Sequence, residues 1–190
     1  MSIELSGKNI NMKILLLTQW FDPEPTFKGL AFAKELTKQG HEVEVLTGFP
    51  NYPQGKLYDG YKLKLFQKEN IEGISVLRVP LYASHDNSAF KRVLNYASFA
   101  VSATLYGIKI KKKADVIYAC GPMPMLRAIK HYAQENGQDA YISLEERMAC
   151  GVGACLGCVC NTVQKDAHSH VNNTRICTDG PVFAAKDVDI

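Results

Sequence analysis

The sequence predicts an α/β fold in which a half-domain built on a parallel sheet precedes a small cysteine-rich module. Continuous apolar runs of strand length, such as Lys13–Thr18, alternate with helical patterns, which is typical of a parallel sheet covered on both faces. The charge balance changes near residue 119, since residues 1–118 hold 16 Lys and Arg against 11 Asp and Glu, and the remainder holds 6 against 8. All six cysteines follow this point.

The order of the predicted elements indicates a Rossmann-like sheet of four or five strands with right-handed crossovers. Apolar residues recur at helical spacing in three segments, and Gly40 and Gly137 suit the ends of two of them. Ser143 and Glu146 have the spacing of a capping box and predict one further helical turn. The expected helices are Phe27–Gln39, 90–111 and Met125–Asn136. The expected strands and extended segments are Lys13–Thr18, Glu42–Thr47, Lys62–Lys68, Ser75–Val79, Asp115–Ala119 and Ala140–Ser143.

Composition narrows the classes of function. The net charge of +3 is too small to indicate nucleic-acid binding. No stretch reaches the roughly 18 to 20 apolar residues needed to span a bilayer. Residues 1–11 read as a polar leader without the apolar run of a signal peptide, so a cytoplasmic location is expected. Disulfides are then disfavoured, and the cysteines indicate metal or redox chemistry.

Four cysteines follow the plant-type ferredoxin spacing: Cys150-x4-Cys155-x2-Cys158 with a distant Cys177. This pattern predicts that they are the ligands of a [2Fe–2S] cluster. The glycines between them allow the loop to approach inorganic sulfide closely and to point backbone N–H groups at sulfur. A zinc site is the alternative, although zinc usually takes paired short Cys clusters and only one short pair occurs here. Cys160 could replace Cys158 as a ligand, but the spacing favours a spectator thiol.

Residues from about 115 to 190 resemble the C-terminal end of the electron-transfer subunit of NAD-dependent dihydroorotate dehydrogenase. The resemblance is carried by DVIYACGPMPML, AYISLEERMACGVGACLGCVC, KDAHSHV and RICTDGPVFAAKDV. It implies cluster ligation by the same four cysteines, a relay between two flavins, and a role in pyrimidine synthesis. It also implies a catalytic dihydroorotate dehydrogenase subunit as partner, with FAD and NAD as further cofactors.

Cys120-Gly121-Pro122 resembles the CGP motif of the wider ferredoxin-reductase superfamily, where it lies at the nicotinamide-binding edge of the sheet. A plain strand-to-helix turn with an early proline is an equal alternative. No G-x-G-x-x-G occurs in the chain, and the flavin-binding barrel expected before this region is missing. The expected division is residues 119–139 as the end of an NAD domain and residues 140–190 as the cluster-binding module.

Residues 12–118 resemble the N-terminal domain of a family 4 glycosyltransferase with a GT-B fold. MKILLLTQWFDPEPTFKGLAFAKEL, GHEVEVLTGFPNYPQGKLYDGYK and RVPLYASHDNSAFKRVLNYASFA carry this resemblance. It implies an acceptor-facing domain of cell-surface polysaccharide synthesis whose segment 90–113 contacts the inner face of the membrane; a helix packed on the sheet is the alternative. The sugar-nucleotide domain is absent, and Asp22, Glu24, His85 and Asp86 are equivalent as candidate bases, so the catalytic residues are unknown.

Three hypotheses of function follow. The first is an electron-transfer module with one-electron relay through a [2Fe–2S] cluster, at most the electron-transfer component of an oxidoreductase. The second is a glycosyltransferase fragment, inactive without its second domain. The third is a hybrid chain that binds nothing well. Iron content separates the first from the other two.

Overall fold

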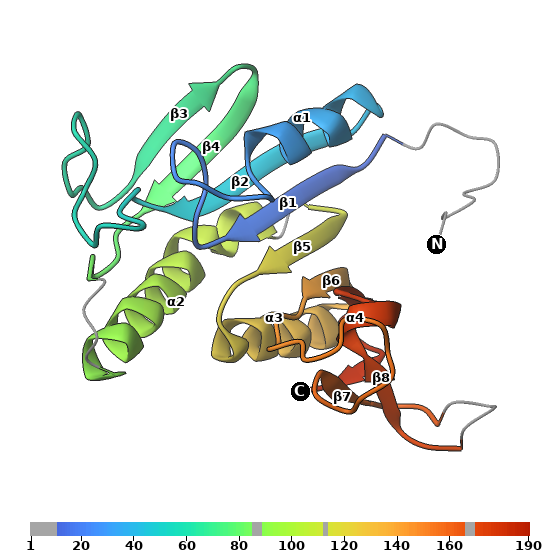
Figure 1. Ribbon diagram of the computed structural model, residues 1–190. Helices are drawn as coiled ribbons and strands as arrows, with labels where there is room; N and C mark the ends of the chain where they lie inside the picture. Colours follow the sequence, from blue (N-terminus) through green and yellow to red (C-terminus); the bar gives the residue numbers. More distant parts are fainter. Residues whose placement is uncertain (1–10, 85–88, 112–113, 166–169) are drawn as a thin grey trace.

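The computed structural model of the chain describes residues 11–84, 89–111, 114–165 and 170–190. The expected leader, apart from residue 11, lies outside the described residues, as do His85, Asp86 and residues 112–113. The described elements form a seven-stranded main sheet with helices on both faces, followed by a three-stranded sheet (Figure 1). In the part of the chain that the structure describes, no helix is long and apolar enough to cross a membrane.

The main sheet has the strand order β3-β4-β2-β1-β5-β6-β9. Strands β4, β2, β1, β5 and β6 are parallel to their neighbours, and β3 and β9 add to the two edges in antiparallel orientation. The strands of this sheet are β1 (Lys13–Thr18), β2 (Glu42–Gly48), β3 (Gln67–Ile71), β4 (Ile74–Val79), β5 (Val116–Cys120), β6 (Asp139–Ser143) and β9 (Val182–Ala184). Four or five strands were expected, so the sheet is larger than the sequence indicated.

Helices cover both faces of the main sheet because the central strands direct apolar side chains to each face in turn. The helices are α1 (Leu30–Lys38), α2 (Ala89–Lys111), α3 (Met123–Asn136) and the short α4 (Ile176–Asp179). Ile14 and Leu16 of β1 lie in a core cluster with Ala33 of α1. Leu15 and Leu17 face the other way and share a cluster with residues of α2 and α3. This arrangement explains why β1 is a continuous apolar run.

Strand β5 joins the two halves of the chain. Its residues pair in parallel with β1 on one side and β6 on the other, for example Leu15 with Ile117 and Ile117 with Ala140. Ile117 is fully buried. The chain therefore runs outward from β1 through β2 and β4, and then returns to the centre to build β5 and β6 on the opposite side.

The C-terminal module contacts the main sheet through strand pairing and through the shared hydrophobic cluster. Its own three-stranded sheet has the order β10-β7-β8, formed by β7 (Val159–Thr162), β8 (Asn173–Arg175) and β10 (Val188–Asp189). Between β8 and β10 the chain passes through α4 and then β9, which pairs with β6. Val188 and Ile176 are buried in the same cluster as α3.

Most expected elements are confirmed, with two corrections. No helical turn follows Ser143: residues 144–148 have no regular structure, and Leu144 is held by its backbone N–H bond to the Pro181 carbonyl. The segment expected near Lys62–Lys68 becomes strand only from Gln67, because it is this stretch that pairs with β4. Gly137 ends α3 in the left-handed conformation, as expected.

Candidate iron–sulfur centre and switch-point pocket

A glycine-rich loop between β6 and β7 carries three of the predicted ligands. Gly151 and Gly153 adopt positive φ angles of 69° and 77°, which residues with a Cβ rarely adopt. At Gly153, a Cβ would also come within 2.8 Å of Thr178 Cγ2 in α4. The loop therefore approaches α4 closely at Gly153, and α4 carries the fourth predicted ligand, Cys177.

Cys150 and Cys155 form one pair of thiols within this loop. The Cys155 backbone N–H donates to Cys150 Sγ at 3.4 Å, and the Gly157 N–H donates to Cys155 Sγ at 3.4 Å. Hydrogen bonds from the Val152 amide, the Cys155 amide and the Cys155 thiol lower the pKa of Cys150 to about 6. The predicted aiming of backbone N–H groups at sulfur is thus present, and it favours the thiolate form that binds metals.

Cys158 and Cys177 form the second pair. Cys158 is 2% exposed, and its carbonyl accepts a hydrogen bond of 3.0 Å from the Ile176 N–H, which brings α4 beside the loop. A hydrogen bond with the Cys158 thiol, together with burial, raises the pKa of Cys177, and the Gly153 amide opposes this shift. The charge of Cys150 also acts on Cys177, so the two pairs belong to one site.

Cys160 lies next to this site but differs from the four thiols. It belongs to β7, where it is opposite Thr174 of β8, and it packs against the main hydrophobic cluster. Burial raises the pKa of Cys160. This environment is that of a small apolar side chain.

The four thiols form two contacting pairs, Cys150 with Cys155 and Cys158 with Cys177. Two thiol pairs with amide donors fit two irons bridged by inorganic sulfide, because each pair can serve one iron.

A second feature is a pocket of about 640 Å³ at the carboxyl ends of β1 and β5. Cys120, Gly121 and Pro122 line it, and Pro122 is the N-cap of α3. Lys28 Nζ donates to Cys120 Sγ at 3.4 Å and to Ser143 Oγ, and the Cys120 thiol donates to Glu145 Oε1 at 3.8 Å. Burial raises the pKa of Cys120. The three motif residues thus reach a cavity.

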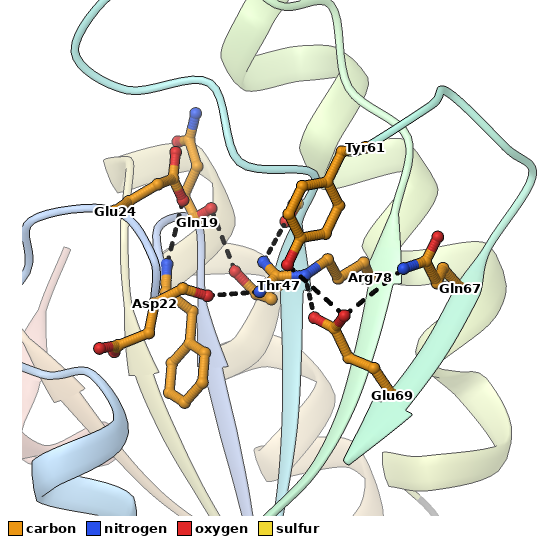
Figure 2. Close-up of polar contacts among 10 residues, drawn as sticks. Gln19, Asp22, Glu24, Thr47, Tyr61, Gln67, Glu69 and Arg78 are labelled. Carbon is orange, nitrogen blue, oxygen red and sulfur yellow. Dashed lines mark hydrogen bonds and ion pairs between the residues drawn. The ribbon is translucent and has the colours of Figure 1, made fainter. Parts of the chain in front are cut away.

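A buried arginine supports the loops beside this pocket, and the sequence analysis did not identify it. Arg78 is fully buried at the end of β4, where it forms an ion pair with Glu69 and donates to the carbonyls of Asp22 and Gly48 (Figure 2). Its guanidinium lies 5.0 Å from the centre of the Tyr61 ring. A basic residue in a strand gives no signal that it will be buried; only the pairing with Glu69 could have suggested it.

Glu24, one of the four polar residues considered as a base, has a structural position. Its carboxylate accepts hydrogen bonds from the backbone N–H groups of Phe21, Asn51 and Tyr52 at 2.8 to 3.1 Å. It is 2% exposed, and burial raises its pKa against the effect of these bonds. Asp22 Oδ2 accepts from the Leu30 N–H at 2.6 Å and so holds the start of α1. Glu24 therefore connects the loop after β1 to the loop after β2.

The structure defines a mixed α/β protein with a cysteine module, and comparisons with known proteins agree. Residues 145–189 match the family "Iron-sulfur cluster binding domain of dihydroorotate dehydrogenase B". The predicted iron–sulfur module and the resemblance of the C-terminal part to this electron-transfer system are confirmed by this match.

Curated relatives carry the same name. The chain is 53% identical over 76 residues to the "Dihydroorotate dehydrogenase B (NAD(+)), electron transfer subunit" of Fusobacterium nucleatum, covering 40% of this chain and 26% of that protein. It is 36% identical over 129 residues to the subunit of the same name from Caldanaerobacter subterraneus, covering 68% of this chain and 47% of the relative. The chain thus spans between about a quarter and a half of the length of these relatives.

A solved structure has a similar fold over most of the chain. It is that of the NADH-dependent reduced ferredoxin–NADP oxidoreductase, with a TM-score of 0.58, 21% identity, and coverage of 94% of this chain and 55% of the other. At this identity the likeness establishes the fold alone. The comparisons lend no support to the glycosyltransferase resemblance of residues 12–118, nor to the expected membrane contact through residues 90–113.

Proposed function

We propose that the chain transfers single electrons through a [2Fe–2S] cluster held by Cys150, Cys155, Cys158 and Cys177. The observation that carries the proposal is the arrangement of these thiols as two contacting pairs on one glycine-rich loop and the adjoining helix. When bound, the cluster supplies a centre that accepts and passes on one electron at a time. We assign residues 140–190 to this module, residues 119–139 to the end of a nucleotide-binding type of domain, and residues 12–118 to a Rossmann-like half.

Contacts within the chain hold the four thiols in positions suited to binding iron. Cys150 and Cys155 would hold one iron, since they contact each other within the loop. Cys158 and Cys177 would hold the second, since the Ile176 N–H bond and the close approach at Gly153 place α4 against the loop. The amides of Val152 and Gly157 point at sulfur and would stabilise its negative charge in either redox state.

The partner we propose is the catalytic subunit of a dihydroorotate dehydrogenase, in pyrimidine biosynthesis. The name of the relatives from Fusobacterium nucleatum and Caldanaerobacter subterraneus supports it. FAD and NAD are expected on the same ground. Cys120, Gly121 and Pro122 are the residues that we propose at the NAD edge, and no residues of this chain are assigned to FAD.

Two substitutions test the ligand set. Cys155→Ser removes one of the four ligands and should abolish the visible absorption of the reconstituted protein. Cys160→Ser is the matched control, because Cys160 packs against the core two residues beyond Cys158, and it should retain iron and colour. Loss of the cluster in Cys160→Ser with retention in Cys155→Ser would overturn the assignment.

A further inference from the structure

Helix α2 carries apolar side chains on the side that faces away from the main sheet as well as on the side that packs against it. Its inner side contributes Phe99 and Ala103 to the core cluster of β1. The large apolar side chains of its outer side, between 38% and 70% exposed, are Phe90, Val93, Leu94, Val101 and Leu105. Figure 1 shows α2 at the outside of the molecule, on the face of the sheet opposite α1. A helix that is apolar all round is typical of a buried element, so the outer side requires a cover.

The outer side of α2 has the residue spacing of a helix–helix contact. Intervals of four, three, four and three residues separate the members of one stripe, which is the a and d pattern of a coiled coil. The members of this stripe are Phe90, Leu94, Ala97, Val101 and Thr104. No charged residue occurs between positions 93 and 107, so no charge would be buried along it. The small side chain of Ala97, in the middle, permits a second helix to approach to about 8 Å.

The stripe is complementary to itself in the antiparallel direction. With a two-fold axis beside Ala97, Phe90 lies opposite Leu105 of the second copy, and the same contact recurs on the other side of the axis. Leu94 likewise lies opposite Val101 of the second copy, and the two small Ala97 side chains meet near the axis. Each large apolar side chain therefore faces another, as an interface between identical surfaces requires.

The apolar surface around α2 is large enough for a stable interface. Phe66 packs its ring against Tyr106 with centroids 5.8 Å apart, so the segment before β3 lies beside the second half of α2. Leu63, Leu65 and Phe66 of this segment are at least 50% exposed. Together with the stripe they present on the order of 800 Å² of apolar surface, which is what each partner contributes to a standard interface and more than the few hundred Å² that a monomer usually leaves uncovered.

We propose that this chain forms a symmetric dimer in which α2 packs antiparallel against α2 of a second copy, with Leu63, Leu65 and Phe66 at the border of the interface. A second helix explains the four-three spacing and the small residue at the centre, which a flat lipid surface does not require. Helices that lie on membranes also have a strongly charged face, whereas the other face of α2 is buried against the main sheet. None of the four ligand cysteines lies on α2, so the proposal does not depend on the cluster.

Sedimentation equilibrium of the full chain over a range of concentrations measures this association, and we expect a monomer–dimer equilibrium. Val101→Glu should weaken the dimer at least about a hundredfold, because the symmetry buries the unpaired charge twice. Val101→Ser, which removes the apolar contact without adding a charge, should weaken it about tenfold. Val163→Glu is the matched control, since Val163 is 53% exposed in the C-terminal module and should leave the association unchanged.

A pair of opposite charges tests the antiparallel direction. Leu94→Glu and Val101→Lys should each weaken the dimer, because each buries an unpaired charge. The double variant should regain at least about tenfold in affinity over either single variant, because each introduced carboxylate lies opposite an introduced ammonium of the second copy. Parallel helices would instead place like charges opposite each other, and the double variant would show no recovery.

Several results would overturn the proposal. One is a parent chain that stays monomeric at every concentration examined. Others are equal effects of Val101→Glu and Val163→Glu, or no recovery in the double variant. Binding of a monomeric parent to phosphatidylglycerol vesicles, lost in Val101→Glu, would assign the stripe to a lipid surface instead. Circular dichroism and the iron content of each reconstituted variant establish that it is folded, so that a loss of association can be attributed to α2.

Discussion

The close approach of the ligand loop to α4 predicts different costs for two neighbouring glycines. Gly151 and Gly153 both have positive φ angles, so replacing either by alanine places a Cβ in the left-handed region at a cost of about 1–2 kcal/mol. At Gly151 nothing lies within 4 Å of the new Cβ, and this strain is the whole effect. At Gly153 the Cβ meets Thr178 Cγ2 at 2.8 Å, so the Thr178 side chain must turn away or α4 must move.

The added cost at Gly153 follows from what Thr178 would lose. Its hydroxyl donates to Asp179 Oδ1 at 3.1 Å, and turning the side chain away breaks this bond, for about 1 kcal/mol more. We therefore expect Gly153→Ala to destabilise the module by about 2–3 kcal/mol and Gly151→Ala by about 1–2 kcal/mol. Movement of α4 also displaces Cys177, so Gly153→Ala should lose iron more readily.

Urea unfolding followed by far-UV circular dichroism measures the first effect, and the rate of iron release to a chelator measures the second. Gly151→Ala serves as the matched control, because it carries the backbone strain without the contact. Equal destabilisation and equal iron release in the two variants would refute the inferred approach between the loop and α4.

Three further predictions concern the main sheet. Arg78→Met should lower the free energy of unfolding in urea by about 3–5 kcal/mol, since it leaves the Glu69 carboxylate and two carbonyls without their buried partner. Lys34→Met, which breaks an exposed ion pair, should lower it by less than about 1 kcal/mol, and equal losses in the two variants would contradict the stabilising role of the buried Arg78 contacts. Burial raises the pKa of Glu24 above 4.5, so the folded state binds a proton that the unfolded state releases, and the free energy of unfolding should fall as pH rises from 4.5 through the raised pKa. In Glu24→Gln the free energy of unfolding should fall less over this range, and a pH profile identical to that of the parent would contradict the prediction. Ile117→Ala should cost about 2–5 kcal/mol and shift all spectroscopic transitions together, because β5 pairs with both halves of the sheet; separate melting of the two halves would argue against one shared core.

Most elements of the fold could be predicted from short sequence patterns. The apolar run of β1, the helical spacing of α3 and the stop at Gly137 depend on neighbouring residues, and these were predicted nearly to their observed bounds. Strand β9 pairs with β6, whose residues lie about 40 positions earlier in the chain, and no short sequence pattern predicts a strand of three residues. The same holds for the helical turn wrongly expected after Ser143, where the chain follows Pro181 instead of forming a cap.

In the candidate site, too, features set by neighbouring residues could be predicted and features set by distant contacts could not. The spacing of Cys150, Cys155 and Cys158 and the glycines between them are local, so the ligand loop could be predicted. The contacts of Arg78 with Asp22 and Gly48, and the contact of Lys28 with Cys120, join residues far apart in the chain, and no short sequence pattern indicates them. The structure was needed to show that the motif Cys120-Gly121-Pro122 opens onto a cavity.

An anaerobic absorption spectrum of purified, iron-reconstituted protein, with iron and acid-labile sulfide assayed on the same sample, tests the central claim most directly. We predict visible charge-transfer bands that bleach with dithionite, with about two irons and two sulfides per chain, as a [2Fe–2S] centre requires. A colourless protein without iron, or one that binds a single ion without sulfide, would contradict the electron-transfer function.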